Sequence, residues 1–150
     1  MNGFILKRFQ TELEETLQNI ACVDNIVIAS LDGIATTYAS RSGQNIDSIA
    51  ARSASFLSLG DIWEDTSGNL SCDNVIMESS TGTVVVIHMG SKLLLCMTST
   101  DDATTGLILH HAKSCADRLL DITQSIVQLG ERPPLVDSIL PGSLPNIVSA

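Results

Sequence analysis

The stretch that decides the topology runs from residue 72 to residue 98 and reads CDNVIMESSTGTVVVIHMGSKLLLCMT. Short turns at Ser80–Gly82 and Gly90-Ser91 divide it into three segments rich in aliphatic and β-branched residues: Cys72–Ser79, Thr83–Met89 and Lys92–Thr98. Regular short spacing of this kind is typical of antiparallel strands that follow one another in a sheet. We therefore predict a three-stranded meander over this stretch.

A second strand pair is predicted upstream of the meander. Val23–Leu31 is an apolar, largely β-branched run, and Ile34–Ala39 continues as its return strand. Asp32-Gly33 lies between them, and this dipeptide favours a type I′ turn, in which both central residues have positive φ. The two regions together predict five antiparallel strands.

Two amphipathic helices flank the strands. In Phe4–Ile20 apolar residues recur at steps of four, four and three, which is a helical stripe: Phe9, Leu13, Leu17 and Ile20. The second helix is predicted from about Ala103 to Gln128. Asp101 or Asp102 can cap its amino-terminal end, because a carboxylate accepts from the exposed amides there.

A third helix is predicted between the two strand groups, starting at a cap of Asn45 or Asp47 and running to about Trp63; a loop over Glu64–Ser71 follows. Small and apolar residues cover much of its circumference, whereas a helix on one sheet needs an apolar stripe of roughly 100°. Two interpretations stay open. The helix packs on its own sheet and also on a partner, or it is a well-buried central helix of a monomer.

The element order is helix, two strands, helix, three strands, helix, which predicts an α/β domain of the α+β sandwich class. We assign residues 1–128 to this one domain, since 150 residues suit a single core. Residues 129–150 form a tail that contains all four prolines of the chain and several apolar residues. Proline excludes a regular helix or a central strand there.

Composition argues against several classes of function. A net charge of −9 disfavours nucleic acid and anionic membrane surfaces, which both need clustered Lys and Arg. No run of eighteen apolar residues is present, so we expect no membrane span. The four cysteines show no zinc spacing, and no secretory signal is visible. We therefore expect a cytoplasmic protein with free thiols.

Signatures of catalysis are also missing. The sequence has no Gly-x-x-x-x-Gly-Lys or Gly-x-Gly-x-x-Gly phosphate loop and no Gly-x-Ser-x-Gly nucleophile elbow. His111 and Cys115 lie four residues apart on a predicted helix, but a metal would need two further ligands, such as His88 and Cys96. Packing is the favoured role of these residues, and we expect no enzyme activity, no cofactor and no metal.

Two features point instead to protein partners. Trp63 is the only tryptophan, and exposed Trp is enriched in binding hot spots; a partly buried lid residue is the competing interpretation. If Asn74–Glu78 forms a sheet edge, the strand carries Asp73 and Glu78 but no Pro or Lys to blunt it. Pairing with a second copy would satisfy such an edge.

The order of elements and several residues resemble the roadblock domain family, which includes dynein light chains, Ragulator subunits and bacterial MglB-type GTPase regulators. The resemblance spans roughly Phe4 to Ile126. The matching features are the Asp32-Gly33 hairpin, Asp47-x-x-Ala50-Ala51 at the start of the central helix, the loop at Gly68, the turns at Gly82 and Gly90, Leu93-Leu94, and the acidic cap before Gly106-Leu107.

The resemblance implies a roadblock/profilin-like sandwich, with one five-stranded antiparallel sheet and helices on both faces. It also implies a homodimer in which the central helices pack together and the third strands pair. Carried onto this chain, that interface comprises Ile46, Ile49, Ala50, Ser53, Ala54, Leu57, Gly60, Val75 and Met77. Roadblock dimers bind small Ras-like GTPases, and the candidates for such contacts here are Arg41, Arg52, Phe56 and Trp63.

The leading hypothesis is therefore a homodimeric scaffold or regulator of a small Ras-like GTPase that works by protein binding. Two alternatives stay open: a structural adaptor or self-assembling light-chain-like module without a GTPase, and a small-ligand sensor. A polar-rimmed apolar surface on the helices favours the first. Further pairing of sheet edges favours the second, and a deep pocket with convergent polar groups favours the third.

Overall fold

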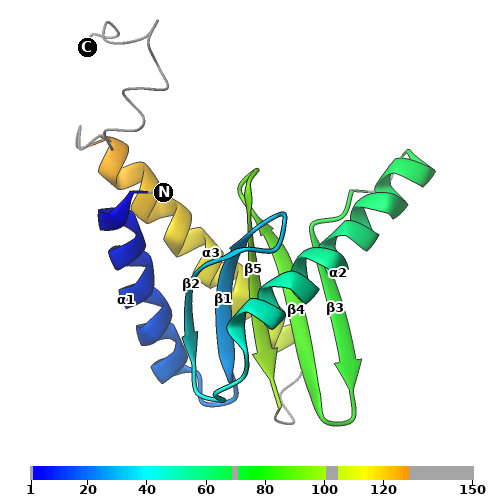
Figure 1. The fold of residues 1–150 in the computed structure, drawn as a ribbon, viewed down its shortest axis with the longest axis horizontal. Helices are drawn as coiled ribbons and strands as arrows, with labels where there is room; N and C mark the ends of the chain where they lie inside the picture. The colour runs from blue at the N-terminus through cyan, green and yellow to red at the C-terminus, as the bar shows by residue number, and fades with distance from the viewer. Residues whose placement is uncertain (1, 69–70, 101–104, 129–150) are drawn as a thin grey trace, which may run out of the picture.

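The computed structural model describes residues 2–68, 71–100 and 105–128 of the chain (Figure 1). The predicted element order is confirmed. The elements are α1 (Gly3–Asn19), β1 (Asn25–Ser30), β2 (Ala35–Ser40), α2 (Ile46–Ser67), β3 (Asn74–Ser79), β4 (Gly82–Met89), β5 (Leu93–Ser99) and α3 (Thr105–Gln128).

The strands form one five-stranded sheet in the order β2-β1-β5-β4-β3, and every neighbouring pair is antiparallel. The predicted meander occupies one side of this sheet and the predicted hairpin the other. β1 joins them by pairing with β5 from Asn25 opposite Thr98 to Ser30 opposite Leu93. The two edges of the sheet are therefore β2 and β3.

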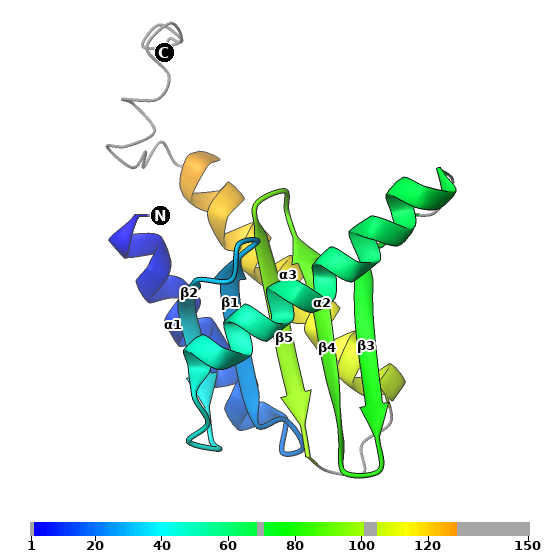
Figure 2. The ribbon, with the colours of Figure 1, turned by 45° about the vertical axis from the view of Figure 1, so that its right-hand side comes forward.

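Helices cover both faces of the sheet, as predicted (Figure 2). Alternate residues of each strand point to opposite faces, so Ile26 and Ile28 face α1 and α3, whereas Val27 and Ala29 face α2. All four side chains are fully buried. This explains why the inner strands read as continuous apolar runs and not as alternating ones.

The turn between β1 and β2 differs from the predicted type I′ turn. Among the described residues only glycines have positive φ, so Asp32 does not adopt the left-handed conformation; Gly33 does, with a φ of 93°. The Gly33 amide donates to the Ser30 carbonyl over 3.0 Å, and the Ser30 amide donates to the Ile34 carbonyl over 2.9 Å. This is the three-residue loop with a final left-handed glycine, the alternative that the same residues allow.

The central helix α2 is longer than predicted. The side-chain oxygen of Asn45 accepts from the amide of Ser48 over 3.0 Å, so Asn45 is the cap, and Asp47 lies in the first turn. At the other end α2 continues to Ser67, so the predicted loop over Glu64–Ser71 is wrong in its first half. The helix ends where Gly68 takes a φ of 71°, the left-handed conformation that commonly ends helices.

Two predictions lie outside the described residues: the acidic cap at Asp101 or Asp102 and the proline-containing tail over residues 129–150. Within residues 2–68, 71–100 and 105–128, no helix combines the length and the apolar character needed to cross a membrane.

Candidate protein-binding surface and cavity

The inner side of α2 is core. Five predicted interface residues on it are buried against the protomer's own sheet: Ile49, Ala50, Ser53, Ala54 and Leu57. A second copy cannot reach these side chains while the protomer stays folded. A partner that contacts α2 would therefore meet the opposite face of the helix.

Gly60, another predicted interface residue, also faces the protomer itself. A Cβ at this position would lie 2.1 Å from Cys72 Sγ and 3.2 Å from Val75 Cγ2. The glycine therefore lets α2 approach the start of β3 closely. Val75 is half-buried under the helix, and Ile46 is half-buried at the other end of α2.

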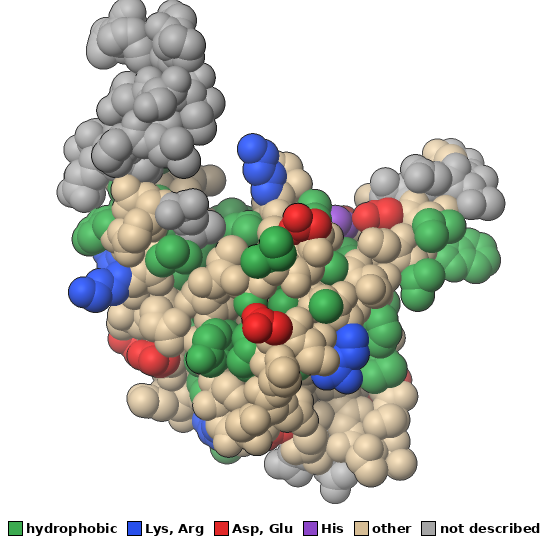
Figure 3. Space-filling model, in the orientation of Figure 1, with side chains coloured by type: hydrophobic (Ala, Val, Ile, Leu, Met, Phe, Trp, Pro, Cys, Tyr) green, Lys and Arg blue, Asp and Glu red, His purple; other side chains and the backbone are tan. Residues whose placement is uncertain are grey.

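The carboxy-terminal part of α2 projects beyond the sheet edge at β3, and hydrophobic side chains gather on this projecting end (Figures 1 and 3). Leu59, Ile62 and Trp63 are 59%, 57% and 68% exposed, and Met77 on β3 is 46% exposed. We call these four residues the α2–β3 surface. Isolated exposed apolar residues are ordinary, but a group of large ones is a candidate binding surface.

The strand beside this surface is a sheet edge. Within the described part of the chain, β3 pairs with β4 alone, so the other side of its backbone has no strand partner there. An open edge is a template for pairing with another chain unless charges, proline or a covering element blunt it. Glu78 of this strand accepts from the hydroxyl of Thr105 and thus contacts α3.

Arg41 has a structural role. Its guanidinium donates to the carbonyl oxygens of Val23 over 2.6 Å and Ile20 over 3.3 Å, and also to that of Leu17. The last carbonyls of a helix have no partner within the helix, and a basic side chain satisfies them while offsetting the negative end of the dipole. Arg41 therefore caps α1 and ties it to β2, and these contacts occupy the group that was predicted to bind a partner.

Replacing Arg41 with alanine is expected to lower the free energy of unfolding by about 1–2 kcal/mol, because several partly buried carbonyls lose a charged donor. Urea denaturation followed by circular dichroism measures the change. Arg8→Ala is the matched control, since Arg8 is exposed on α1. Equal stability of the two variants would show that the cap contributes nothing.

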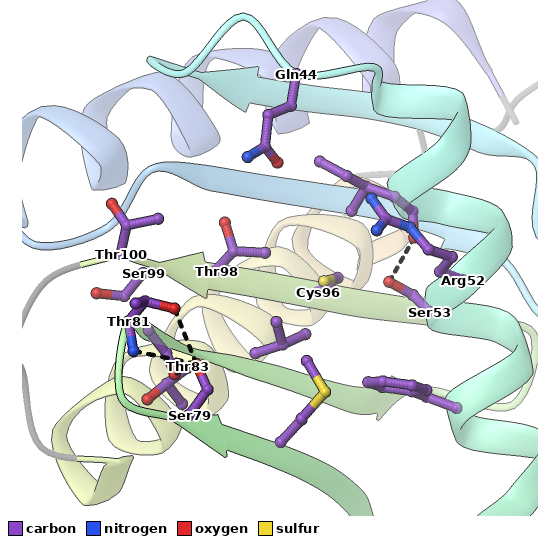
Figure 4. Close-up of a pocket in the computed structure, with 15 residues that line it drawn as sticks. Gln44, Arg52, Ser53, Ser79, Thr81, Thr83, Cys96, Thr98, Ser99 and Thr100 are labelled. Atoms are coloured by element: carbon purple, nitrogen blue, oxygen red, sulfur yellow. Dashed lines mark hydrogen bonds between the residues drawn. The ribbon is translucent and has the colours of Figure 1, made fainter.

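A cavity of about 250 Å³ opens on the α2 face of the sheet, in the part that the diagonal helix leaves uncovered (Figure 4). Arg52 and the half-buried Phe56, both predicted partner residues, lie on its helix wall. Cys96 lies on its floor. Burial raises the pKa of the Cys96 thiol to about 11, and the hydrogen bond with Ser53 and the charge of Arg52 oppose the rise. The thiol is therefore neutral at pH 7.

The fold separates the candidate metal ligands of the sequence. Cys96 packs on the α2 face of the sheet, whereas Cys115 packs on the opposite face with α1 and α3. His88 lies 3.5 Å from Asp61 of α2, between Nε2 and Oδ1. These residues do not form one coordination sphere.

Sequence reasoning missed Leu59 and Ile62 as interface candidates. The positions of the buried residues Ala54 and Leu57 fix which side of the helix faces the sheet, and Leu59 and Ile62 then fall on the other side. Counting the helical period from one residue known to face the sheet would have identified them. Because small residues occur on all sides of the helix, the sequence does not show which side faces the sheet.

No protein-family model matches the chain, and no curated protein matches it in sequence. Solved structures share its fold. Myxococcus xanthus MglB has a TM-score of 0.73 at 16% identity, covering 84% of this chain and 95% of that one. A structure described as MglB with tetrameric arrangement has a TM-score of 0.71 at 19% identity, covering 83% and 94%.

A roadblock/LC7 domain from Streptomyces avermitilis has a TM-score of 0.68 at 16% identity, covering 77% of this chain and 97% of that domain. The resemblance stated from the sequence is therefore confirmed at the level of the fold. This chain has the fold of the roadblock/LC7 domain.

Proposed function

We propose that this chain is a homodimeric, cytoplasmic roadblock-type protein that scaffolds or regulates a small Ras-like GTPase by binding it, with no catalytic residue of its own. The observation that carries the proposal is the α2–β3 surface, where exposed apolar side chains lie beside an open strand edge. A protomer that exposes both together offers a second chain both apolar burial and backbone hydrogen bonds.

A symmetric pairing uses both features at once. Antiparallel pairing of β3 with β3 of a second copy creates a two-fold axis normal to the sheet, and the same patch then serves both partners. Both α2 helices stay on one face, and each projecting end crosses the edge onto the other copy's sheet. Leu59, Ile62 and Trp63 of each copy would thereby be covered, and ten strands would form one sheet.

The GTPase part of the proposal rests on the resemblance to roadblock proteins and on the fold shared with MglB. A dimer of this kind presents two α2 helices on one face, which is a broad surface for a third protein. Arg52 lies on the exposed side of α2, and we retain it as a candidate contact with the GTPase. Arg41 does not, because it caps α1.

The wild-type dimer as bait tests the proposal directly. We expect it to capture a Ras-like GTPase from lysate of the source organism, with different yields after loading with GDP or with a non-hydrolysable GTP analogue. Bait carrying Arg52→Glu is the comparison, and Arg8→Glu on α1 is its matched control. Dimers that retain no GTPase in either nucleotide state would favour the adaptor function.

A further inference from the structure

The cavity beside α2 is built from polar groups as well as apolar ones. Its floor and helix wall contain Ile49, Phe56, Met77, Val84 and Cys96. Residues that carry hydroxyl groups line the rest of it from α2, the β3–β4 hairpin and the end of β5: Ser53, Ser79, Thr81, Thr83, Thr98, Ser99 and Thr100. In Figure 4, Ser53 lies beside Arg52 on α2, whereas Thr98, Thr81 and Ser79 lie on the strands and the hairpin turn.

Arg52 gives the cavity its charge. It is the only charged residue among the described residues that line it. Its Nε donates to the carbonyl of Ser48 over 3.3 Å, and no ion pair joins it to a carboxylate in the described part of the chain. Although the net charge of the chain is −9, this guanidinium lies beside the cavity without an ion pair to a described carboxylate. Such a group binds carboxylate or phosphate oxygens.

The hydroxyl of Thr98 is oriented from behind by a buried amide. Asn25 is 1% exposed, and its Nδ2 donates to Thr98 Oγ1 over 2.8 Å. The Oδ1 of Asn25 accepts from the hydroxyls of Ser40 over 2.6 Å and Ser42 over 3.0 Å, which fixes the direction of the amide. Thr98 accepts on its inner side, so its own proton is left to donate into the cavity.

We propose that this cavity binds a small organic anion, a hydroxylated carboxylate with a short apolar segment. The carboxylate would lie at Arg52, a ligand hydroxyl at Thr98, and the apolar segment on Ile49 and Val84. A volume of about 250 Å³ lies just below the usual range of ligand pockets, which suits a metabolite-sized molecule. The site is additional to the proposed function and does not rest on it.

The projecting α2 end of a second copy is the competing occupant. It can cover Phe56 and Met77 at the β3 side of the cavity. The exposed side chains of that end include Leu59, Ile62 and Trp63, whereas the far side of the cavity is polar, with Gln44, Thr98 and Thr100. A polar far side with a guanidinium at its opening favours a polar, anionic ligand over apolar side chains.

Titration of the full chain with 3-hydroxybutanoate, followed by amide chemical shifts, tests the site. We expect saturable shifts at the cavity residues, and we expect the isosteric neutral 3-hydroxybutanamide to bind roughly tenfold or more weakly, because it lacks the charged hydrogen bond. Arg52→Ala should remove this preference for the acid. Arg8→Ala, distant on α1, should retain it.

Val84→Phe fills the cavity without changing any charge, and we expect it to abolish the saturable shifts. The proposal is overturned if neither 3-hydroxybutanoate nor 3-hydroxybutyl phosphate produces saturable shifts at millimolar concentration. It is also overturned if the amide chemical shifts of the cavity residues change only with protein concentration, and if Trp63→Ala removes that concentration dependence. In that case the second copy occupies the cavity.

Discussion

Replacing Ile62 with glutamate is expected to convert the dimer into a folded monomer. Ile62 belongs to the α2–β3 surface and is 57% exposed in the protomer, so the change costs the single chain little. In the symmetric dimer the substitution occurs twice and places two carboxylates in an apolar contact. We expect at least about a hundredfold weaker association.

Multi-angle light scattering after gel filtration measures this change, as a mass that falls from twice 16.0 kDa to 16.0 kDa. Val127→Glu is a closely matched control, because Val127 is also 57% exposed but lies on α3, on the other side of the sheet. The wild type and the control should both be dimers. Dimeric Ile62→Glu, or a monomeric wild type at micromolar concentration, would exclude the α2–β3 surface as the interface.

The largest effect on stability is expected from Ala54→Glu. Ala54 is 8% exposed, and a Cβ at Gly33 would lie 3.4 Å from its Cβ, so the space beside it is filled by the β1–β2 turn. A glutamate there forces a charge into the core or separates the turn from α2. We expect a loss of roughly 3 kcal/mol or more in the free energy of unfolding.

Ala51→Glu is the control, three residues earlier on the same helix and exposed. It is expected to change stability by less than about 0.5 kcal/mol. Urea denaturation monitored by circular dichroism compares the two variants. Similar losses would mean that both faces of α2 are core. From the sequence alone, Ala54→Glu is predicted to break a dimer; the structure instead predicts loss of the folded protomer.

This difference shows where sequence reasoning succeeded and where it stopped. Strand periodicity, short turns and helical stripes predict the element order, because each depends on contacts between near neighbours in sequence. The rotation of α2 about its own axis, in contrast, is set by which side of the helix packs on the sheet. Small residues occur on both sides of that helix: Ala54 faces the core, while Ala51 faces outward. The composition of α2 therefore does not reveal its inner face.

The roles of single polar residues were equally inaccessible. Arg41 was predicted to be a partner contact, because it precedes α2 in the chain, and in the fold its side chain reaches back to the carbonyls of Leu17 and Val23. The cavity assembles residues from α2, the β3–β4 hairpin and β5. No local pattern marks those residues as neighbours, since only the diagonal course of α2 leaves that part of the sheet open.

The position of β1 has a consequence for how the chain emerges from the ribosome. Its partner strand β5 ends at Ser99, so β1 has only β2 beside it until the carboxy-terminal strands are synthesised. A nascent chain that stops before Leu93 holds two separate hairpins, each with an apolar strand that lacks a neighbour. Pairing across such a distance is slow and exposes these edges to aggregation. Folding of this domain is therefore expected to be completed by the last strand and not by the first hairpin.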